Sequence, residues 1–342
     1  MLRKGVIFTT IAITLLFIYG LNISISPIER ADETIKVAIS IDILRTIISP
    51  VINGVGEIYS IVSERVEPHG FVLTPSIVSN VSKSDLIIVT GHMEWEKKLI
   101  EEIAEIKGIE ADLTFIDLSK LSGLRILELN GEKNLHGFWL LPDNALLIAK
   151  EVKERISRIR PDISQKIEEN YEEFKRRVLT LKNFLNRILD KYDIYGRDVI
   201  IGFYAEQYVA EAIGLRVASA LIGEGESIRP ETLRNIYEGL KSGKYACIIV
   251  SDVAVLVENT KEAIKEISRE SSCPVAFVLT VSSGGLQEYD MVMYYNAGQI
   301  CCALLTQPRQ LLSSSDMYLP IIIALLTIIA LETIFLVRRR VK

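Results

Sequence analysis

Two of the three histidines in this 342-residue chain lie in loop segments with aromatic neighbours, where imidazole could bind a metal ion. His69 belongs to residues 66–71 (VEPHGF) and His136 to residues 134–139 (NLHGFW). Neutral imidazole suits Zn²⁺ and Mn²⁺, and each metal-binding ring needs an acceptor on its other nitrogen. A histidine beside apolar residues is more often a packed, hydrogen-bonded residue, so the loops alone leave both interpretations open. His92 precedes a predicted helix and is expected to be a loop or capping residue.

The sequence carries no motif of the common enzyme classes. It has no H-E-x-x-H, no G-x-S-x-G and no glycine-rich phosphate loop. Paired carboxylates such as Glu101-Glu102 and Glu168-Glu169 fall on polar helix faces, where solvation accounts for them. Two histidines with a carboxylate would also suit a catalytic metal site. Without a supporting motif, the chain is predicted not to be an enzyme.

The elements that would position the histidines alternate between strands and helices. The first half has short apolar segments typical of strands, at residues 34–40, 57–63, 86–90 and 114–118. Amphipathic segments between them predict helices at 41–52, from Thr74-Pro75 onward, at 94–105 and at 143–159. This alternation predicts a parallel sheet covered on both faces. Ligands bind such sheets at the carboxyl ends of strands, which is where both histidine loops are expected.

A long amphipathic helix is predicted over residues 161–192. Its apolar residues recur in steps of three and four, which places them on one helical stripe. These residues are Ile163, Ile167, Tyr171, Phe174, Val178, Leu181, Leu185, Ile188 and Tyr192. At 1.5 Å per residue the helix would be roughly 45 Å long, enough to join two small α/β halves. An ordinary surface helix or a coiled-coil arm is the alternative.

The second half repeats the pattern. Strands are predicted at residues 199–202, 216–221, 246–250 and 274–281, and helices at 205–213, 230–244, 258–271 and 288–305. The predicted fold is α/β: two lobes, each with a mostly parallel sheet flanked by helices, joined by one long linker helix, with a transmembrane segment at each end. The expected boundaries are 1–27 for a signal or anchor, 34–160 for the N-terminal lobe, 161–193 for the linker, 194–310 for the C-terminal lobe and 318–337 for a transmembrane helix.

Both ends of the chain have the composition of membrane segments. Residues 318–337 form an apolar run of about 20 residues, enough to cross a bilayer, and Arg338, Arg339, Arg340 and Lys342 follow it. An apolar run from Gly5 follows Arg3 and Lys4 and suits either an uncleaved anchor or a cleaved signal. If it is uncleaved, both termini are cytoplasmic and residues 28–317 are extracellular.

Charge and cysteine content limit the kinds of partner and metal site that this chain could have. The chain has a net charge of −5, and its terminal basic residues make the part between them more acidic still. That balance argues against nucleic acid and is compatible with cations. The four cysteines, Cys247, Cys273, Cys301 and Cys302, form no C-x-x-C pair, so no thiolate zinc site is indicated. Disulfides and buried free thiols both remain open.

Four segments resemble the zinc- and manganese-specific substrate-binding proteins of ABC transporters, in the cluster with a rigid inter-lobe helix. Residues 67–76 (EPHGFVLTPS) and 85–95 (DLIIVTGHMEW) resemble that family's first lobe. Residues 135–145 (LHGFWLLPDNA) resemble its second histidine loop, and Arg160-Pro161-Asp162 resembles the start of its long helix. The likeness extends over residues 34–310, and its most specific part is the P-H-x-x-x-x-T-P-S run with the later histidine loop.

The resemblance implies that His69 and His136 are metal ligands. The family's third ligand is usually a histidine, placed by the frame of Tyr208 and Gly214-Leu215, and Phe203 occupies that position here. Its fourth ligand is usually an aspartate after the last strand, where this chain has Thr280. Both second-lobe ligands are therefore expected to be lost or moved. Glu206 is a candidate replacement, although a carboxylate in the first turn of a helix is also favoured by the helix dipole.

The family therefore implies a membrane-anchored extracellular solute-binding protein. It would capture a divalent metal ion, zinc or manganese, between its lobes and deliver it to an ABC permease, with no nucleic acid as partner. The alternative is a divergent scaffold of the same family with a degenerate metal site, which binds another ligand or serves as a partner-binding subunit.

Overall fold

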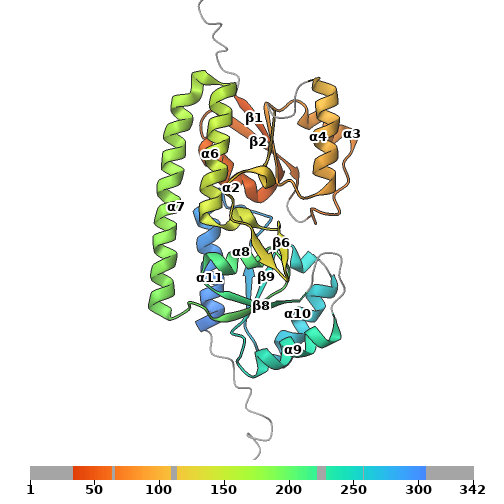
Figure 1. Cartoon of the computed structure of the whole chain (residues 1–342), viewed down its shortest axis with the longest axis vertical. Coiled ribbons are helices and arrows are strands. Elements are labelled where there is room, and N and C mark those ends of the chain that lie inside the picture. The colour runs from red at the N-terminus through yellow and green to blue at the C-terminus, as the bar shows by residue number, and fades with distance from the viewer. Residues whose placement is uncertain (1–33, 64–65, 109–113, 222–228, 257, 306–342) are drawn as a thin grey trace, which may run out of the picture. The chain divides into compact units, whose positions relative to one another are not determined.

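The computed structural model describes residues 34–63, 66–108, 114–221, 229–256 and 258–305 (Figure 1). Within these ranges no helix combines the length and the apolar character needed to cross a bilayer. The membrane segments predicted at residues 1–27 and 318–337 lie outside the described ranges.

The first half of the described chain, residues 34–159, is built on a sheet of four parallel strands in the order β2-β1-β3-β4. The strands are β1 (Ile35–Ile41), β2 (Gly56–Val62), β3 (Leu86–Val89) and β4 (Phe115–Asp117). The helices are α2 (Arg45–Val51), α3 (Pro75–Val81), α4 (Glu94–Lys107) and α6 (Pro142–Ile159), with short 3-10 helices η1 (Asp42–Leu44), η2 (Leu118–Lys120) and η3 (Phe138–Leu140). As predicted, Thr74 caps α3: its side chain accepts a hydrogen bond from Ile77 N at 3.4 Å.

The second half, residues 198–305, has a second parallel sheet, in the order β10-β9-β7-β8. Its strands are β7 (Asp198–Ile201), β8 (Arg216–Ala220), β9 (Ile248–Ser251) and β10 (Val275–Val278). Its helices are α8 (Glu206–Ala212), α9 (Pro230–Lys241), α10 (Glu258–Ser271) and α11 (Tyr289–Leu305), with η5 (Ala254–Leu256) after β9. The two parallel sheets flanked by helices confirm the predicted α/β fold.

Side chains of the second sheet alternate between two hydrophobic clusters. Val199, Ile201 and Ile249 belong to the large cluster that also contains the buried residues of the first sheet. Ile200 and Ile248 point to a smaller cluster with residues of α9 and α10. Because successive residues of a strand face opposite sides, this alternation means that both faces of the sheet are buried, as a parallel sheet requires.

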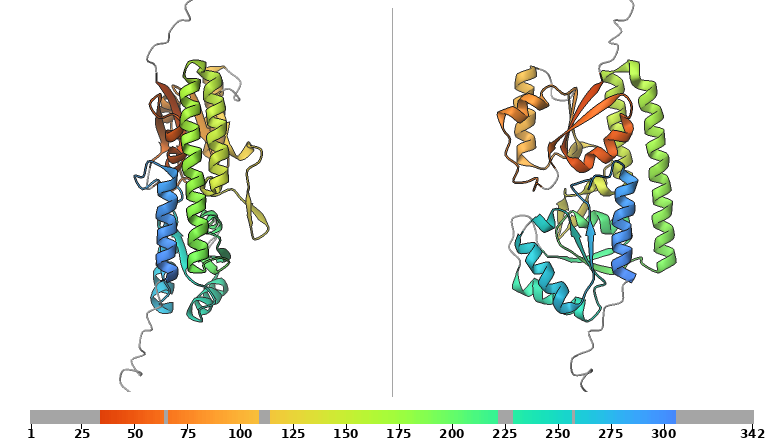
Figure 2. Two further views of the ribbon diagram at one scale, coloured as in Figure 1. Left: turned by 90° about the vertical axis from the view of Figure 1, so that its left-hand side faces the viewer. Right: turned by 180° about the vertical axis from the view of Figure 1, so that it is seen from behind.

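The long helix predicted from Pro161 is present as a 3-10 turn, η4 (Pro161–Ile163), followed by α7 (Ser164–Tyr192). Its 29 residues correspond to about 43 Å. The middle of the predicted stripe is buried, from Ile167 to Leu185, whereas Tyr192 is exposed. The helix packs against α2 and α6 and also against α11, beside which it runs in Figures 1 and 2.

Polar contacts attach α7 to both halves. The amide of Asn170 donates to two backbone carbonyls at the end of α2, those of Val51 (3.0 Å) and Asn53 (2.9 Å). Near the middle of the helix, the Arg177 guanidinium pairs with Glu288 and Asp290, where α11 begins. The helix therefore contacts elements of both halves.

An antiparallel hairpin, β5 (Leu127–Leu129) and β6 (Glu132–Asn134), was not predicted. Its turn residues Asn130 and Gly131 both have positive φ, +56° and +85°, which suits an Asn-Gly type I′ turn. The hairpin belongs to the first half by sequence but attaches to α8 of the second. The hydroxyl of Tyr208 accepts a hydrogen bond from Leu127 N (3.0 Å) and donates to Asn134 O.

Candidate metal centre

The structure brings all three histidines together. The ring centroids of His69, His92 and His136 are 4.9–5.3 Å apart, and one nitrogen from each ring lies within 4.8 Å of those of the other two. The rings border a small cavity of about 20 Å³. Nearly all its other lining residues are apolar, among them Pro68, Met93 and Trp139 from the first half. This is a concave site with three converging nitrogen donors.

His69 is held by the loop that follows β2. The carboxylate of Glu67 accepts hydrogen bonds from the backbone amides of His69 (2.9 Å) and Gly70 (2.6 Å), which fixes the turn. The indole of Trp95, on α4, donates to Pro68 O at 2.8 Å. The loop is thereby tied to the helix that follows β3, so His69 has a supported position beside the first sheet.

His92 is the ligand candidate that sequence reasoning missed, because it was interpreted as a loop or capping residue. It follows the carboxyl end of β3, and its Nδ1 lies 2.9 Å from Thr90 Oγ1. The Thr90 hydroxyl also lies 2.9 Å from Glu96 Oε1, to which it donates. Since a hydroxyl has one proton, Thr90 must then accept from His92 Nδ1–H, which places the ring's lone pair on Nε2.

Glu96 is the buried group behind this arrangement. Its carboxylate also accepts hydrogen bonds from the backbone amides of Thr90 (2.8 Å), Gly91 (2.8 Å) and Met93 (3.2 Å), and so shapes the turn that carries His92. Burial raises the pKa of Glu96 above its usual value, although these donors oppose the rise. One feature of the sequence could have identified His92 as a ligand candidate. Ligands bind beyond the carboxyl ends of parallel strands, and His92 follows such a strand just as His69 does.

His136 follows the β5–β6 hairpin. Asn134 Oδ1 accepts a hydrogen bond from the backbone amide of His136 (2.9 Å) and lies 3.3 Å from its Nδ1. The next residue, Gly137, has φ +93°, and a Cβ there would lie 2.9 Å from Ala205 O of the second half. Only glycine therefore allows the two backbones to approach so closely beside His136.

The second half contributes an apolar wall to the cavity. Phe203, Ala205, Val253 and Val281 line it, and the ring of Phe203 lies edge-on to that of His136, with centroids 5.9 Å apart. Thr280, the other family ligand position, has its polar groups directed at Asp252. Its hydroxyl and backbone amide both donate hydrogen bonds to Asp252 Oδ1, at 2.8 and 2.9 Å.

The structure does not bring Glu206 into the histidine group. Its side chain is fully buried, and its carboxylate accepts hydrogen bonds from Phe203 N (3.0 Å) and Ser251 N (2.7 Å). Burial raises the pKa of Glu206 to about 8, against the effect of these donors. Glu206 thus joins the ends of β7 and β9, a task that the sequence could not show because Ser251 is 45 residues away.

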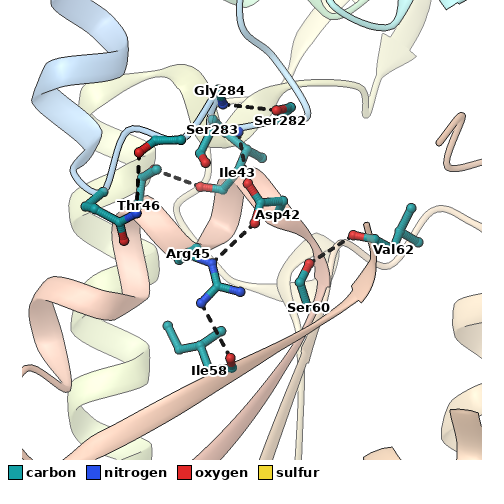
Figure 3. Close-up of polar contacts among 12 residues, drawn as sticks. Asp42, Ile43, Arg45, Thr46, Ile58, Ser60, Val62, Ser282, Ser283 and Gly284 are labelled. Atoms are coloured by element: carbon teal, nitrogen blue, oxygen red, sulfur yellow. Dashed lines mark hydrogen bonds and ion pairs between the residues drawn. The ribbon is translucent and has the colours of Figure 1, made fainter. Parts of the chain in front are cut away.

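The loop that carries Val281 is bound by carboxylates from both halves. Asp252 accepts from the backbone amide of Ser282 (2.7 Å), and Asp42, just after β1, accepts from that of Ser283 (3.0 Å). Figure 3 shows Asp42 between Ser283 and the Arg45 guanidinium. Burial alone would raise the pKa of Asp42, but hydrogen bonds from Ser283 and Arg45 hold it below its usual value. A larger cavity of about 340 Å³, lined in part by both aspartates, adjoins the histidine cavity through Val281.

The fold and this centre define a two-sheet α/β protein with a histidine-rich metal-type site. The family described as "ZnuA: Zinc-uptake complex component A periplasmic" matches residues 37–302, most of the chain. The chain therefore belongs to the ZnuA family. This confirms the resemblance seen in the histidine loops, and it agrees with the prediction that the chain is not an enzyme.

Individual relatives have low sequence identity to this chain, but they align with it over most of its length. The manganese ABC transporter substrate-binding lipoprotein PsaA of Streptococcus pneumoniae serotype 4 is 24% identical over 284 residues, covering 78% of this chain and 88% of the relative. A metal ABC transporter substrate-binding lipoprotein of Lactococcus lactis subsp. lactis is 22% identical over 317 residues, covering 87% and 96%.

Solved structures show the same fold. A ZnuA deletion mutant with zinc bound has a TM-score of 0.66 at 17% identity and covers 81% of this chain and 100% of that one. FpvC from Pseudomonas aeruginosa in complex with Mn²⁺ has a TM-score of 0.64 at 16% identity, covering 80% and 98%.

Proposed function

We propose that this chain is the substrate-binding protein of a metal importer, which captures a divalent ion at His69, His92 and His136 and delivers it to an ABC permease. The observation that carries the proposal is the convergence of the three rings on one small cavity. Relatives named as manganese or metal ABC transporter substrate-binding lipoproteins support it, as does the family description. The cargo predicted from the sequence was Zn²⁺ or Mn²⁺.

The donor set favours Zn²⁺ as the cargo. Three imidazole nitrogens with one further small ligand make a common tetrahedral zinc site, whereas Mn²⁺ prefers carboxylate, carbonyl and water oxygens in a six-coordinate shell. A cavity of about 20 Å³ has room for about one water molecule, not for the several oxygen ligands that Mn²⁺ would need. The apolar wall made by Phe203 and Val281 supplies no oxygen from its side chains.

His92 answers the main objection to metal capture, which was the absence of ligands at Phe203 and Thr280. Two imidazoles alone would hold a divalent ion weakly, and a third nitrogen makes a usual donor count for zinc with an exogenous ligand. The alternative of a degenerate site on a divergent scaffold is therefore not favoured.

We also propose the domain limits expected from the sequence: lobes at 34–160 and 194–310, with a linker helix at 161–193. A helix as long as α7, packed on both halves, would restrict lobe motion to small tilts. Segment 318–337, together with segment 1–27 if that segment is an anchor and not a cleaved signal, would anchor the protein and leave residues 28–317 outside the cell. Anchoring would raise its effective concentration at the permease.

The test is a zinc titration of the purified full-length protein in detergent, compared with His69→Ala, His92→Ala and His136→Ala. Bound zinc is counted by mass spectrometry. Tryptophan fluorescence gives a second readout because Trp139 stacks near His92, with ring centroids 6.2 Å apart. One zinc per chain, bound at least about 10-fold more weakly by each variant, is the expected result.

The matched control is Glu94→Ala, two residues from His92, whose side chain is 82% exposed and pairs only with Lys97 among the ion pairs of the described residues. It should bind zinc as the parent does. Intact protein that takes up no divalent ion, or binding that survives all three histidine changes, would overturn the proposal.

A further inference from the structure

We propose that Gln207, on α8 of the second half, is a positioning residue for the metal site, which acts through Asn134 to set the tautomer of His136. The inference rests on the proposed metal-binding function. It assigns the second half a role at the metal that needs no ligand at Phe203 or Thr280.

The relay begins at the hairpin backbone. Gln207 Nε2 donates to Glu128 O on β5 at 2.9 Å. Because a carbonyl oxygen can only accept, the end of the Gln207 amide that faces Glu128 must be its NH₂ group. The amide oxygen of Gln207 is then directed at Asn134, whose Nδ2 lies 2.8 Å from it.

The hydrogen bonds of the Asn134 side-chain amide fix its orientation and prevent a 180° flip. Its Nδ2 donates to Gln207 Oε1 and also to Tyr204 O, the latter at 2.9 Å, so both amide protons are in use. The oxygen Oδ1 must therefore face His136, where it accepts from the backbone amide at 2.9 Å. Asn134 is also buried, which makes reversal of the amide costly because it would leave polar groups unpaired.

The orientation of Asn134 decides where the ring proton of His136 sits. Asn134 Oδ1 lies 3.3 Å from His136 Nδ1 and cannot donate a proton, so Nδ1 carries the proton and the ring's lone pair lies on Nε2. A ligating histidine needs such an acceptor on its other nitrogen, and losing it typically costs 10- to 100-fold in metal affinity.

The three ligands are therefore supported from different sides. Groups of the first half support two of them: Glu67 holds the backbone of His69, and the Thr90–Glu96 pair orients the ring of His92. His136 is oriented from α8, to which the hairpin is also fixed by Tyr208. A shift of α8 relative to the first sheet would loosen one ligand of three, so metal release can follow from movement of the second half.

The primary measurement reads the tautomer without any metal. The full-length protein is labelled with ¹⁵N-histidine, and long-range ¹H–¹⁵N NMR distinguishes Nδ1–H from Nε2–H rings. With only three histidines in the chain, His136 is assigned from His136→Ala. The expected result is an Nδ1–H ring at His136. An Nε2–H ring in the unaltered protein would overturn the proposal, whatever its zinc affinity.

Two variants then test Gln207 itself. Gln207→Leu removes both hydrogen bonds, and we expect mixed tautomers at His136 and zinc affinity about 10-fold or more lower. Gln207→Glu keeps an acceptor for Asn134 Nδ2 but loses the donor to Glu128 O, so we expect the parental tautomer and most of the affinity, with lower thermal stability than the parent. A merely structural role would lower thermal stability in Gln207→Leu and leave the tautomer unchanged, and that outcome contradicts the proposal. Parent protein that binds no zinc would instead refute the proposed function, while the tautomer still tests the relay.

Discussion

The buried carboxyl group of Glu206 should make the stability of this fold depend on pH. The side chain has no exposed surface, and burial raises its pKa to about 8 from an ordinary value of 4.5. The folded chain therefore holds this proton more tightly than the unfolded chain. The stabilisation that results is full below about pH 4.5 and is lost as the pH rises toward 8.

The size of the effect follows from the width of that window. One pH unit corresponds to about 1.4 kcal/mol for a single group, so between pH 5 and 7 this group should lower the free energy of unfolding by about 3 kcal/mol. Glutamine has no proton to lose, but its NH₂ group would face one of the two backbone amides that donate to the Glu206 carboxylate and cannot accept from it. Glu206→Gln should therefore be less stable than the parent near pH 5, and its free energy of unfolding relative to the parent should rise by about 3 kcal/mol between pH 5 and pH 7.

The assay is urea unfolding of the full-length protein at pH 5, 6, 7 and 8, followed by fluorescence of the two buried tryptophans, Trp95 and Trp139. Burial also raises the pKa of Glu96 and Asp252, so the parent curve contains their contributions. The difference between parent and variant isolates Glu206. The reasoning would be refuted if the difference in free energy of unfolding between parent and variant did not change with pH, or if the parent became more stable relative to the variant as the pH rose.

Other changes test the packing and the metal site. Asn170→Ala leaves two carbonyls at the end of α2 without their side-chain donor and should lower the free energy of unfolding by about 2 kcal/mol in urea titrations. Gly137→Ala would place a Cβ 2.9 Å from Ala205 O and should weaken zinc binding as well as stability, whereas Gly131→Ala, at φ +85° in open space, should cost about 1 kcal/mol and leave zinc binding intact. Phe203→Glu adds a carboxylate beside His136 and should raise Mn²⁺ affinity relative to Zn²⁺ by about 10-fold in competition titrations, with Phe203→Leu as the unchanged control.

Much of the fold followed from local pattern. Short stretches of neighbouring residues encode the apolar parallel strands, the buried stripe of α7 and the Thr74 cap. The structure contains all three. The β5–β6 hairpin was missed although Asn130-Gly131 is a strong turn signal, because its strands have three residues each and alternate too briefly to stand out.

The site was less visible because it depends on contacts between distant residues. His69 and His136 lie in distinctive loops, and the structure brings them together. His92 sits one residue before the N-cap of α4, a position that suits a capping residue equally well. Glu206 follows Phe203, whose ring contacts that of His136, by three residues. Its carboxylate is instead held by the backbone of Ser251, a partner that no spacing rule in the sequence reveals.

The most direct test of the central claim is zinc-edge X-ray absorption of the loaded full-length protein. Three imidazoles on one ion predict three nitrogen ligands at about 2.0 Å with multiple-scattering features of histidine rings, and no sulfur shell. Loss of one imidazole in His92→Ala should accompany the loss of affinity. A spectrum with two imidazoles and carboxylate oxygens in the intact protein, unchanged in His92→Ala, would contradict the account.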